Sequence, residues 1–275
     1  MKMYQVDAFT THLFEGNAAA VLILDAWLDE SLMQKIAREN NLSETAFVKT
    51  IDQKHFEIRW FTPTAEVAFC GHATLASAFV LFRDYTFEHE IEFLVKDLGT
   101  FYVSKQPDHK ISMNFPIRRA KKLSQYPALL SEALTQPIQA VYLNQQAYIV
   151  EYASEQAILD ERPDFVKLKQ LGLQHPEIDN ITVDIAITAQ AEQGHDCISR
   201  YFAPAIGIDE DPVTGSIHTA IAPFWAEKLN KSELIAVQGK DRQGTLFCQL
   251  LENERIEVAG YAKLFMIAEI FIESD

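Results

Sequence analysis

Two short segments of the sequence combine reactive side chains with a glycine just ahead of a predicted helix. The first covers residues 69–74 (FCGHAT) and the second covers residues 211–216 (DPVTGS). The start of a helix has unpaired backbone N–H groups and a partial positive charge, so it can bind a carboxylate. One such start in each half of the chain predicts two similar lobes that close on a small anionic substrate.

Glu44 is a candidate acid or base because it enters an apolar strand pattern at residues 45–48 instead of a charged stretch. A partly buried carboxylate at such a position suits proton transfer. The alternatives are an ordinary exposed acid at the end of a strand, or a capping partner for Ser43.

Asp211 is the third of three consecutive acids, and Pro212 follows it. Proline keeps the residue before it extended, so Asp211 can point into a cleft. Asp209 and Glu210 are interpreted as solvated turn residues, one of which could complement the helix dipole.

His72 and His218 each fall in the first turn of a main predicted helix, where they could donate protons or bind substrate. No HExxH motif, CxxC motif or histidine pair at i, i+4 accompanies them, so the sequence predicts no metal site. The hydroxyl groups nearby could cap the helices, contact the substrate, or do both. They belong to Thr74, Thr214 and Ser216.

Cys70 is open to two interpretations. A thiol beside a helix N-terminus is expected to have a lowered pKa and could act as a nucleophile or as an acid/base. A buried cysteine is more commonly a small hydrophobic residue. A hydrolase would need Cys70 to be activated by a base such as His218, and no third orienting residue stands out.

The composition is that of an ordinary globular protein. The 275 residues are 48% hydrophobic and 23% charged, enough for one large domain or two lobes. The formal net charge is -15 and no basic run occurs, which argues against nucleic acid and anionic membranes as partners.

The sequence predicts a cytoplasmic protein. The first residues do not form a secretory signal, and the longest apolar run, 18–24, is too short to cross a bilayer. The three cysteines are widely spaced, which predicts reduced thiols and no disulfide framework.

The first half of the chain reads as strands around one long helix. Residues 4–8 alternate, and residues 18–24 are apolar on both faces, as in a buried strand. Helices are expected at 29–39, with Asp29 as N-cap, and after Gly71 with an inward stripe that includes Phe79. Further strands are expected at 45–49, 56–61, 91–95, 100–104 and 110–115.

The second half repeats this arrangement of strands around one main helix. A helix is expected at 164–171 and the main helix after Gly215, where Pro223 should kink it or shift its start. Strands are expected at 139–152, 181–188, 196–202, 234–238, 245–250, 255–259 and 264–272. The basic segment 116–127 is the expected hinge region. The first lobe then covers 1–117 with 262–275, and the second covers 118–261.

The chain resembles the phenazine-biosynthesis PhzF-like isomerases, within the diaminopimelate-epimerase-like fold. The similar segments span nearly the whole chain, and their number and order are more specific than any one of them. They are residues 5–9, 16–21, 41–47, 70–74, 199–204, 207–216 and 238–239, with Arg242 and Gly244.

The resemblance implies an α+β fold of two pseudo-symmetric lobes, each a β-barrel-like sheet wrapped around a central helix, with the active site between them. The family's proton-shuttling glutamate falls on Glu44, its histidine on His72 and its second-lobe aspartate on Asp211. The two helix starts would bind a carboxylate-bearing substrate. The expected substrate-binding residues are Cys70, Gly71, Ala73, Thr74, Thr214, Gly215 and Ser216.

Family members isomerise a dihydro-hydroxyanthranilate without metal or organic cofactor, and they suggest a homodimer. The resemblance therefore implies that Glu44 moves a proton between two carbons, while His72 and Asp211 orient the substrate. Three departures bear on the substrate more than on the fold. Ala18 stands where the family usually has proline, Ala68 where it often has an acid, and Ile217 where it usually has alanine.

Two alternatives stay open. One is a two-base epimerase or racemase of amino-acid-like substrates. Its two-cysteine form is disfavoured because the second lobe offers Asp211 instead of a thiol, while Cys197 and Cys248 lie outside the helix-start segments. The other is a non-catalytic protein that binds a small molecule in the same fold.

Overall fold

The computed structural model describes residues 1–173, 182–192 and 194–272, and its chain divides into two compact units. One unit comprises Met1–Asn114 with Glu257–Asp275, and the other Phe115–Ile256. The lobes expected from the sequence differ from these units by a few residues at each boundary. Residue 181, where one strand was expected to begin, and residues 273–275 of the first expected lobe lie outside the described residues.

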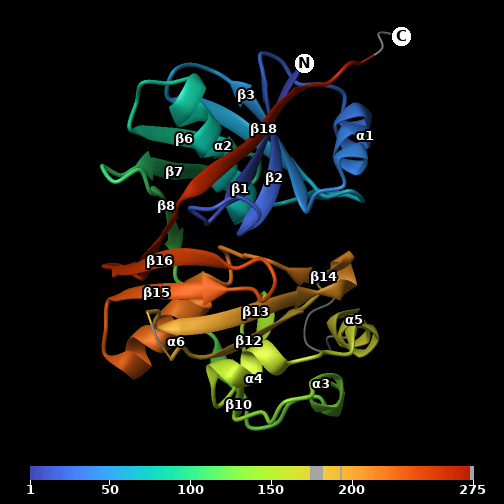
Figure 1. Ribbon diagram of the computed structural model, residues 1–275, viewed down its shortest axis with the longest axis vertical. Coiled ribbons are helices and arrows are strands. Elements are labelled where there is room, and N and C mark those ends of the chain that lie inside the picture. The colour runs from blue at the N-terminus through green and yellow to red at the C-terminus, as the bar shows by residue number, and fades with distance from the viewer. Residues whose placement is uncertain (174–181, 193, 273–275) are drawn as a thin grey trace. The chain divides into compact units, whose positions relative to one another are not determined.

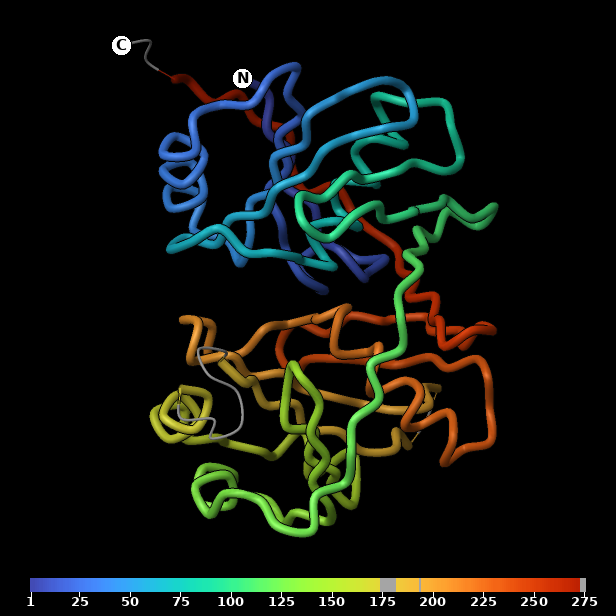
Figure 2. Tube along the Cα trace, turned by 180° about the vertical axis from the view of Figure 1, so that it is seen from behind, coloured from blue at the N-terminus to red at the C-terminus, as the bar shows by residue number. Residues whose placement is uncertain are grey.

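The first unit is a curved sheet in which distant parts of the chain pair. β1 (Lys2–Ala8) runs antiparallel to both β2 (Asn17–Leu24) and β18 (Ala262–Glu269), so the two ends of the chain lie side by side (Figures 1 and 2). β2 is parallel to β3 (Glu44–Thr50), as expected for a strand apolar on both faces. The remaining strands are β4 (His55–Phe61), β5 (Glu66–Val67), β6 (Glu90–Val95), β7 (Gly99–Lys105) and β8 (Ile111–Pro116).

The central helix of this unit is α2 (Gly71–Asp84), which packs against β1, β2 and β3. Only one apolar stripe was expected to face inward, but nearly the whole helix is buried. Ser77 and Ala78 are fully buried, whereas Phe79 of the expected stripe is only half-buried. Small residues on the remaining faces allow the sheet to surround the helix.

A second helix, α1 (Glu30–Asn40), contributes a smaller core on the outside of the same sheet. Met33 and Ile36 pack there with Phe47 of β3. Asp29 is the N-cap as expected, but its side chain makes no capping bond. Its backbone carbonyl instead accepts the N–H groups of residues 32 and 33.

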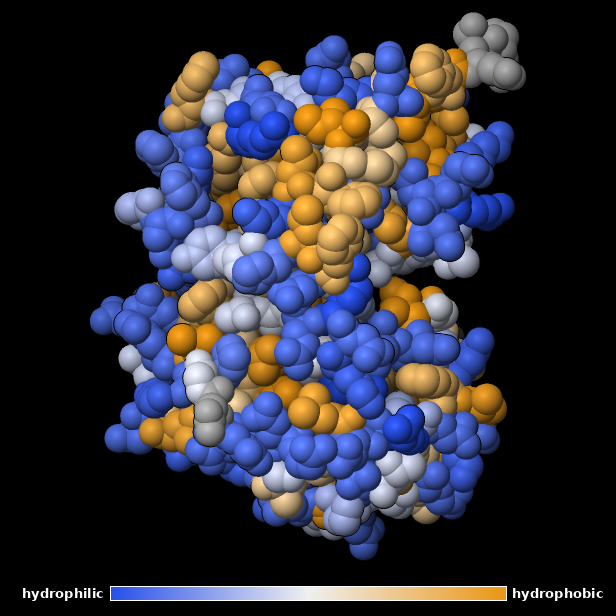
Figure 3. All heavy atoms as spheres, in the orientation of Figure 1, coloured by the Kyte–Doolittle hydropathy of each residue, from blue (hydrophilic) through white to orange (hydrophobic). Residues whose placement is uncertain are grey.

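β18 is held to the first unit by backbone pairing more than by side-chain burial, since none of its side chains is fully buried. Phe265 and Ile267 are 42% and 46% exposed, and apolar surface gathers over this strand (Figure 3). The ring of Phe14 contacts Phe265 edge-on, with centroids 5.8 Å apart. This strand therefore forms an apolar face of the unit.

The second unit follows the same plan around α6 (His218–Leu229), with its sheet running β9–β10–β11–β12–β13 and β13–β15–β16. The helix continues through Pro223. The proline leaves the carbonyl of Thr219 without its helical partner, and the N–H of Arg118 donates to that carbonyl at 3.0 Å.

Several elements of the second unit were not expected: the short helices α3 (Ala128–Ala133) and α4 (Glu155–Asp160), the strands β9 (Lys121–Lys122) and β14, and the 3₁₀ turn Pro204–Ile206. The single strand expected at 139–152 is instead an antiparallel pair, β10 (Ala140–Leu143) and β11 (Ala147–Glu151). The others are α5 (Phe165–Leu173), β12 (Asp184–Gln190), β13 (Cys197–Ala203), β15 (Glu233–Gln238), β16 (Gly244–Leu251) and β17 (Arg255–Gly260), which reaches into the first unit.

Asp209 and Glu210 were interpreted as solvated turn residues, but they lie in β14 (Ile208–Asp211), paired with β13. Arg200 of β13, 4% exposed, donates to both carboxylate oxygens of Glu210 at 2.7 and 2.8 Å. The expectation failed for Glu210 because a buried cation satisfies its charge; Asp209 is exposed as expected. Among the helices of the described ranges, none is long and apolar enough to cross a membrane.

Candidate active site

Three chemically active side chains of the first unit meet at the start of α2. Cys70 is the N-cap residue of this helix, His72 lies in its first turn, and Glu44 is the first residue of β3. All three are buried, with 7%, 3% and 8% of their surfaces exposed. Two elements separated in sequence therefore bring together three of the predicted site residues.

His72 is the centre of this cluster. Its Nε2 lies 3.1 Å from Oε2 of Glu44, close enough for an ion pair. His72 is the one charged side chain that the described residues place against this oxygen. The other ring nitrogen, Nδ1, lies 3.1 Å from Nδ2 of Asn17 and 3.3 Å from Sγ of Cys70.

The pKa values of the cluster correct one expectation. Burial, reinforced by the Glu44 carboxylate, raises the pKa of the Cys70 thiol to about 11, against the opposing effect of His72. The Ala73 N–H at the helix start acts to lower this pKa, but the loss of solvation outweighs it. Burial lowers the pKa of His72, but Cys70 and Glu44 raise it further, so the net direction is upward.

Near neutral pH these directions leave Cys70 as a thiol and favour an imidazolium ion at His72. A carboxylate beside an imidazolium can exchange a proton with it or with a bound molecule. The cluster therefore has the groups that general acid/base chemistry needs.

The first turn of α2 also has the features of an anion site. The Thr74 side chain donates to the carbonyl of Cys70 at 2.6 Å and is itself only 1% exposed. The Thr74 N–H makes the first helical bond, to the same carbonyl. The N–H groups of Gly71 and Ala73 precede that bond, so they belong to the turn whose donors have no helical acceptor.

In the second unit, Asp211 ends β14 and its carboxylate accepts a hydrogen bond from the Thr214 hydroxyl. Gln238 holds this turn from β15. Its Oε1 accepts the Thr214 N–H at 3.0 Å, and its Nε2 donates to the Asp211 carbonyl at 2.9 Å and to the Thr214 hydroxyl at 3.0 Å. One buried amide thus fixes the turn that precedes α6.

Gly215 and Ser216 begin a tight turn that continues into α6, through a bond from the His218 N–H to the Gly215 carbonyl. No described residue accepts the N–H of Gly215 or Ser216. The Ser216 hydroxyl accepts from Nε2 of Gln146 at 2.8 Å. This turn has the donors that an anion requires.

Sequence reasoning missed the polar chain behind Ser216. Nε2 of Gln146 also donates to the Tyr201 hydroxyl at 3.0 Å, and that hydroxyl donates to Asp184 at 2.6 Å. Burial, opposed by this hydrogen bond and reinforced by Asp211, raises the pKa of Asp184 to about 7. The signal was present: Asp184 interrupts an apolar strand, as Glu44 does.

His218 does not fit the role of proton donor considered for it. It is fully buried, and burial lowers its pKa to about 4, so the ring is neutral near neutral pH. Its Nδ1 donates to the Thr214 carbonyl at 2.9 Å. This histidine therefore supports the turn.

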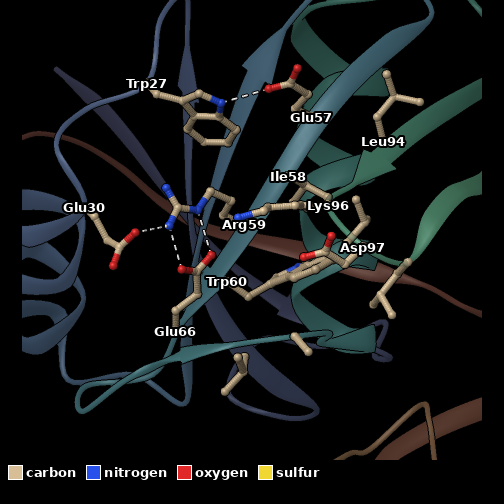
Figure 4. Close-up of a pocket in the computed structure, with 14 residues that line it drawn as sticks. Trp27, Glu30, Glu57, Ile58, Arg59, Trp60, Glu66, Leu94, Lys96 and Asp97 are labelled. Atoms are coloured by element: carbon tan, nitrogen blue, oxygen red, sulfur yellow. Dashed lines mark hydrogen bonds and ion pairs between the residues drawn. The ribbon is translucent and has the colours of Figure 1, made fainter.

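A cavity of about 820 Å³ in the first unit lies elsewhere, along β4 and the turn after β6 (Figure 4). Several of its polar side chains already contact one another. Arg59 pairs with Glu30 and Glu66 at 2.7 and 2.6 Å, and Trp27 donates to Glu57 at 2.8 Å. The lining includes Ala68 but not the three residues of the cluster, so the reactive groups do not belong to this cavity.

The fold is the α+β fold also seen in a hydroxyproline epimerase from Agrobacterium vitis, with a TM-score of 0.59 at 9% identity over 98% of this chain and 91% of that one. The family model for phenazine biosynthesis-like proteins, PhzC-PhzF, matches residues 6–268, and the chain belongs to this family.

Closer relatives agree with this assignment. An Enterococcus faecalis protein of the PhzF family has a solved structure with a TM-score of 0.89 and 38% identity, covering 98% of this chain and 99% of that one. A Pseudomonas aeruginosa protein, named an uncharacterized isomerase, is 43% identical over 96% of each chain.

Proposed function

We propose that the protein is an isomerase that moves a proton between carbons of a small carboxylate-bearing substrate, with Glu44 as the acid/base. The observation that carries this proposal is the buried Glu44 carboxylate, whose Oε2 lies 3.1 Å from Nε2 of His72 at the start of α2. A buried carboxylate can take a proton from carbon and return it elsewhere.

His72 has a supporting role in this proposal. Its upward-shifted pKa favours the imidazolium, which stabilises the Glu44 carboxylate before proton transfer and the negative charge that develops afterwards. Asn17 lies on the opposite side of the ring, where its amide oxygen, once the amide is rotated, can accept from Nδ1 of the imidazolium. Cys70 remains protonated and lines the same cluster.

Groups of both units are proposed to bind the substrate. The N–H groups of Gly215 and Ser216, together with those of Gly71 and Ala73, are proposed to bind substrate carboxylate or other acceptor oxygens. Asp211 is proposed to orient a substrate amine, since a carboxylate attracts a cationic group. A dihydro-hydroxyanthranilate carries both an amine and a carboxylate, so it is a suitable first substrate to test.

The alternatives make different demands on these residues. An epimerase exchanges the proton at a single stereocentre, whereas a positional isomerase delivers it to a different carbon. A binding protein needs the helix starts but not the Glu44 carboxylate. Following where the proton goes therefore separates the three functions.

The test is deuterium incorporation in D₂O, followed by NMR, with dihydro-hydroxyanthranilate and a panel of amino and hydroxy acids. Glu44→Gln keeps the shape of the side chain and removes the base, so we expect at least about a 100-fold loss of exchange rate with binding retained. The exposed Glu39→Gln is the matched control and should behave as wild type. Equal exchange rates in wild type and Glu44→Gln would refute the role of Glu44.

A further inference from the structure

The cluster at the start of α2 has a second chemical use. We propose that Glu44, Cys70 and His72 form a site for a thiophilic divalent cation such as Zn²⁺, and that an ion bound there blocks the proton-transfer function of Glu44. The site goes beyond the proposed isomerase activity, and the sequence motifs did not predict it.

The geometry of the cluster is close to that of a three-ligand metal site. One ligand atom from each residue lies within 4.8 Å of the other two. Nε2 of His72 is 3.1 Å from Oε2 of Glu44 and 4.0 Å from Sγ of Cys70. In a tetrahedral zinc site with these ligand types, the ligand atoms lie roughly 3.3–3.8 Å apart, so the two separations from His72 need shifts of only a few tenths of an ångström.

The donor set selects the class of ion. A thiolate, an imidazole and a carboxylate together suit Zn²⁺ and the probe ions Co²⁺ and Cd²⁺ better than Mg²⁺ or Ca²⁺, which prefer oxygen ligands only. The described residues of the cluster supply three ligands, and catalytic and inhibitory zinc sites commonly take water or a bound molecule as the fourth.

Two features of the surroundings favour the site. Oε2 of Glu44 is buried and lies 3.1 Å from Nε2 of His72, so a cation ligated by both atoms would take the place of their ion pair. Asn17 contacts Nδ1 of His72, and rotation of its amide lets Oδ1 accept a proton there while Nε2 ligates the metal.

Binding is balanced by the release of protons. The metal–sulfur bond replaces the S–H bond of Cys70, and the thiol proton leaves to solvent or buffer. His72 ligates as the neutral imidazole through Nε2, so its imidazolium proton also leaves to solvent or buffer and two protons are released in all. The ion then occupies the Glu44 oxygen that would accept the substrate proton, so metal and proton transfer compete for one atom.

The experiment is a titration of the metal-free protein with Cd²⁺ and Co²⁺, reading the thiolate-to-metal charge-transfer band. We expect saturation at one ion per chain. Cys70→Ser should abolish the band, while Cys248→Ser, a buried cysteine away from the cluster, should leave it unchanged. Saturation without a thiolate band, or a band that survives Cys70→Ser, would overturn the proposal.

Glu44→Gln and His72→Gln give a second test that does not remove the sulfur. Each variant should keep the band but weaken the affinity at least tenfold, because each loses a ligand. Circular dichroism of each variant shows whether it folds. Affinities equal to wild type in both folded variants would reduce the site to a lone thiolate and overturn the three-residue assignment.

Inhibition by the bound ion is tested in a separate deuterium-exchange assay. With a substrate identified by deuterium exchange, saturating Zn²⁺ should abolish exchange, and a chelator should restore it. Full exchange with the site saturated, as judged by the charge-transfer band, would refute inhibition. The band itself requires no substrate, so the metal site can be established or refuted even if the proposed isomerase activity fails.

Discussion

Replacing Asp184 with asparagine should stabilise the second unit in alkaline solution and have little effect in acid. Burial raises the pKa of Asp184 to about 7 from its usual 3.8, with the Tyr201 hydroxyl opposing the shift and Asp211 adding to it. The folded carboxyl therefore keeps its proton over a range of pH in which the unfolded one has lost it. The resulting stabilisation is complete below about pH 3.8 and disappears as the pH rises through about 7.

The size of the effect follows from those two values. The difference between 3.8 and about 7 corresponds to a change of about 4 kcal/mol in the free energy of unfolding across the window, as an upper bound. Asp184 is half-buried, so solvent screens part of this cost and about 2 kcal/mol is expected. Asparagine can still accept from Tyr201 and has no proton to lose.

Tryptophan provides a local assay for this prediction. The chain has three tryptophans, and Trp225 is the one in the second unit, where it donates to Thr188 of β12, the strand that begins at Asp184. Fluorotryptophan labelling with fluorine NMR would follow urea unfolding at Trp225 in wild type and variant. Asp209→Asn, an exposed acid on β14, is the control.

The prediction depends on a pH-dependent difference in the free energy of unfolding between Asp184→Asn and wild type. If Asp184→Asn changes the free energy of unfolding by the same amount near pH 4 and near pH 8, the carboxyl does not titrate between its folded and unfolded states as argued. A variant that is less stable than wild type near pH 8 would show instead that the negative charge is needed there.

Three further substitutions test the packing of the second unit. Glu161→Gln should destabilise the protein by about 3 kcal/mol in urea unfolding, because this buried carboxylate accepts from Tyr152 and from residues 135 and 136; a loss below about 1 kcal/mol would contradict this. Burial lowers the pKa of His218 to about 4 from 6.5, so the free energy of unfolding should fall by about 3 kcal/mol as the pH drops from 6.5 to about 4. In an acid titration of stability, His218→Gln should remove this dependence on pH. Gly239→Ala should be destabilised by several kcal/mol in thermal unfolding, since φ is +99° and the new Cβ would lie 2.4 Å from the carbonyl oxygen of residue 242; a wild-type Tm would show that the turn adapts.

The long regular elements could be predicted from the sequence because their patterns are local. Residues 18–24 are apolar on both faces, and β2 is indeed a buried strand with parallel and antiparallel neighbours. The helices after Gly71 and Gly215 were also expected. β14 was not, because three acids suggest a solvated turn. The deciding partner of Glu210 is Arg200, whose contact depends on the pairing of β13 and β14.

The site was only partly predictable for a related reason. Glu44 and Asp184 present the same signal, a single acid in an apolar strand, but only Glu44 also matched a family segment. The polar chain through Tyr201 and Gln146 joins three strands or strand ends, so no spacing within one segment indicates it. The contact of Glu44 with His72 likewise depends on the packing of α2 beside β3.

At the start of α2, two opposing effects set the protonation state of Cys70. The motif places a thiol at a helix start, which alone would favour a thiolate. Burial and the Glu44 carboxylate act in the opposite direction and raise the pKa to about 11, so near neutral pH the sulfur is a thiol. A divalent cation would reverse this balance, because its charge offsets Glu44 and stabilises the thiolate that burial disfavours. The same three side chains thus suit proton transfer when free of metal and metal binding when Zn²⁺ is available.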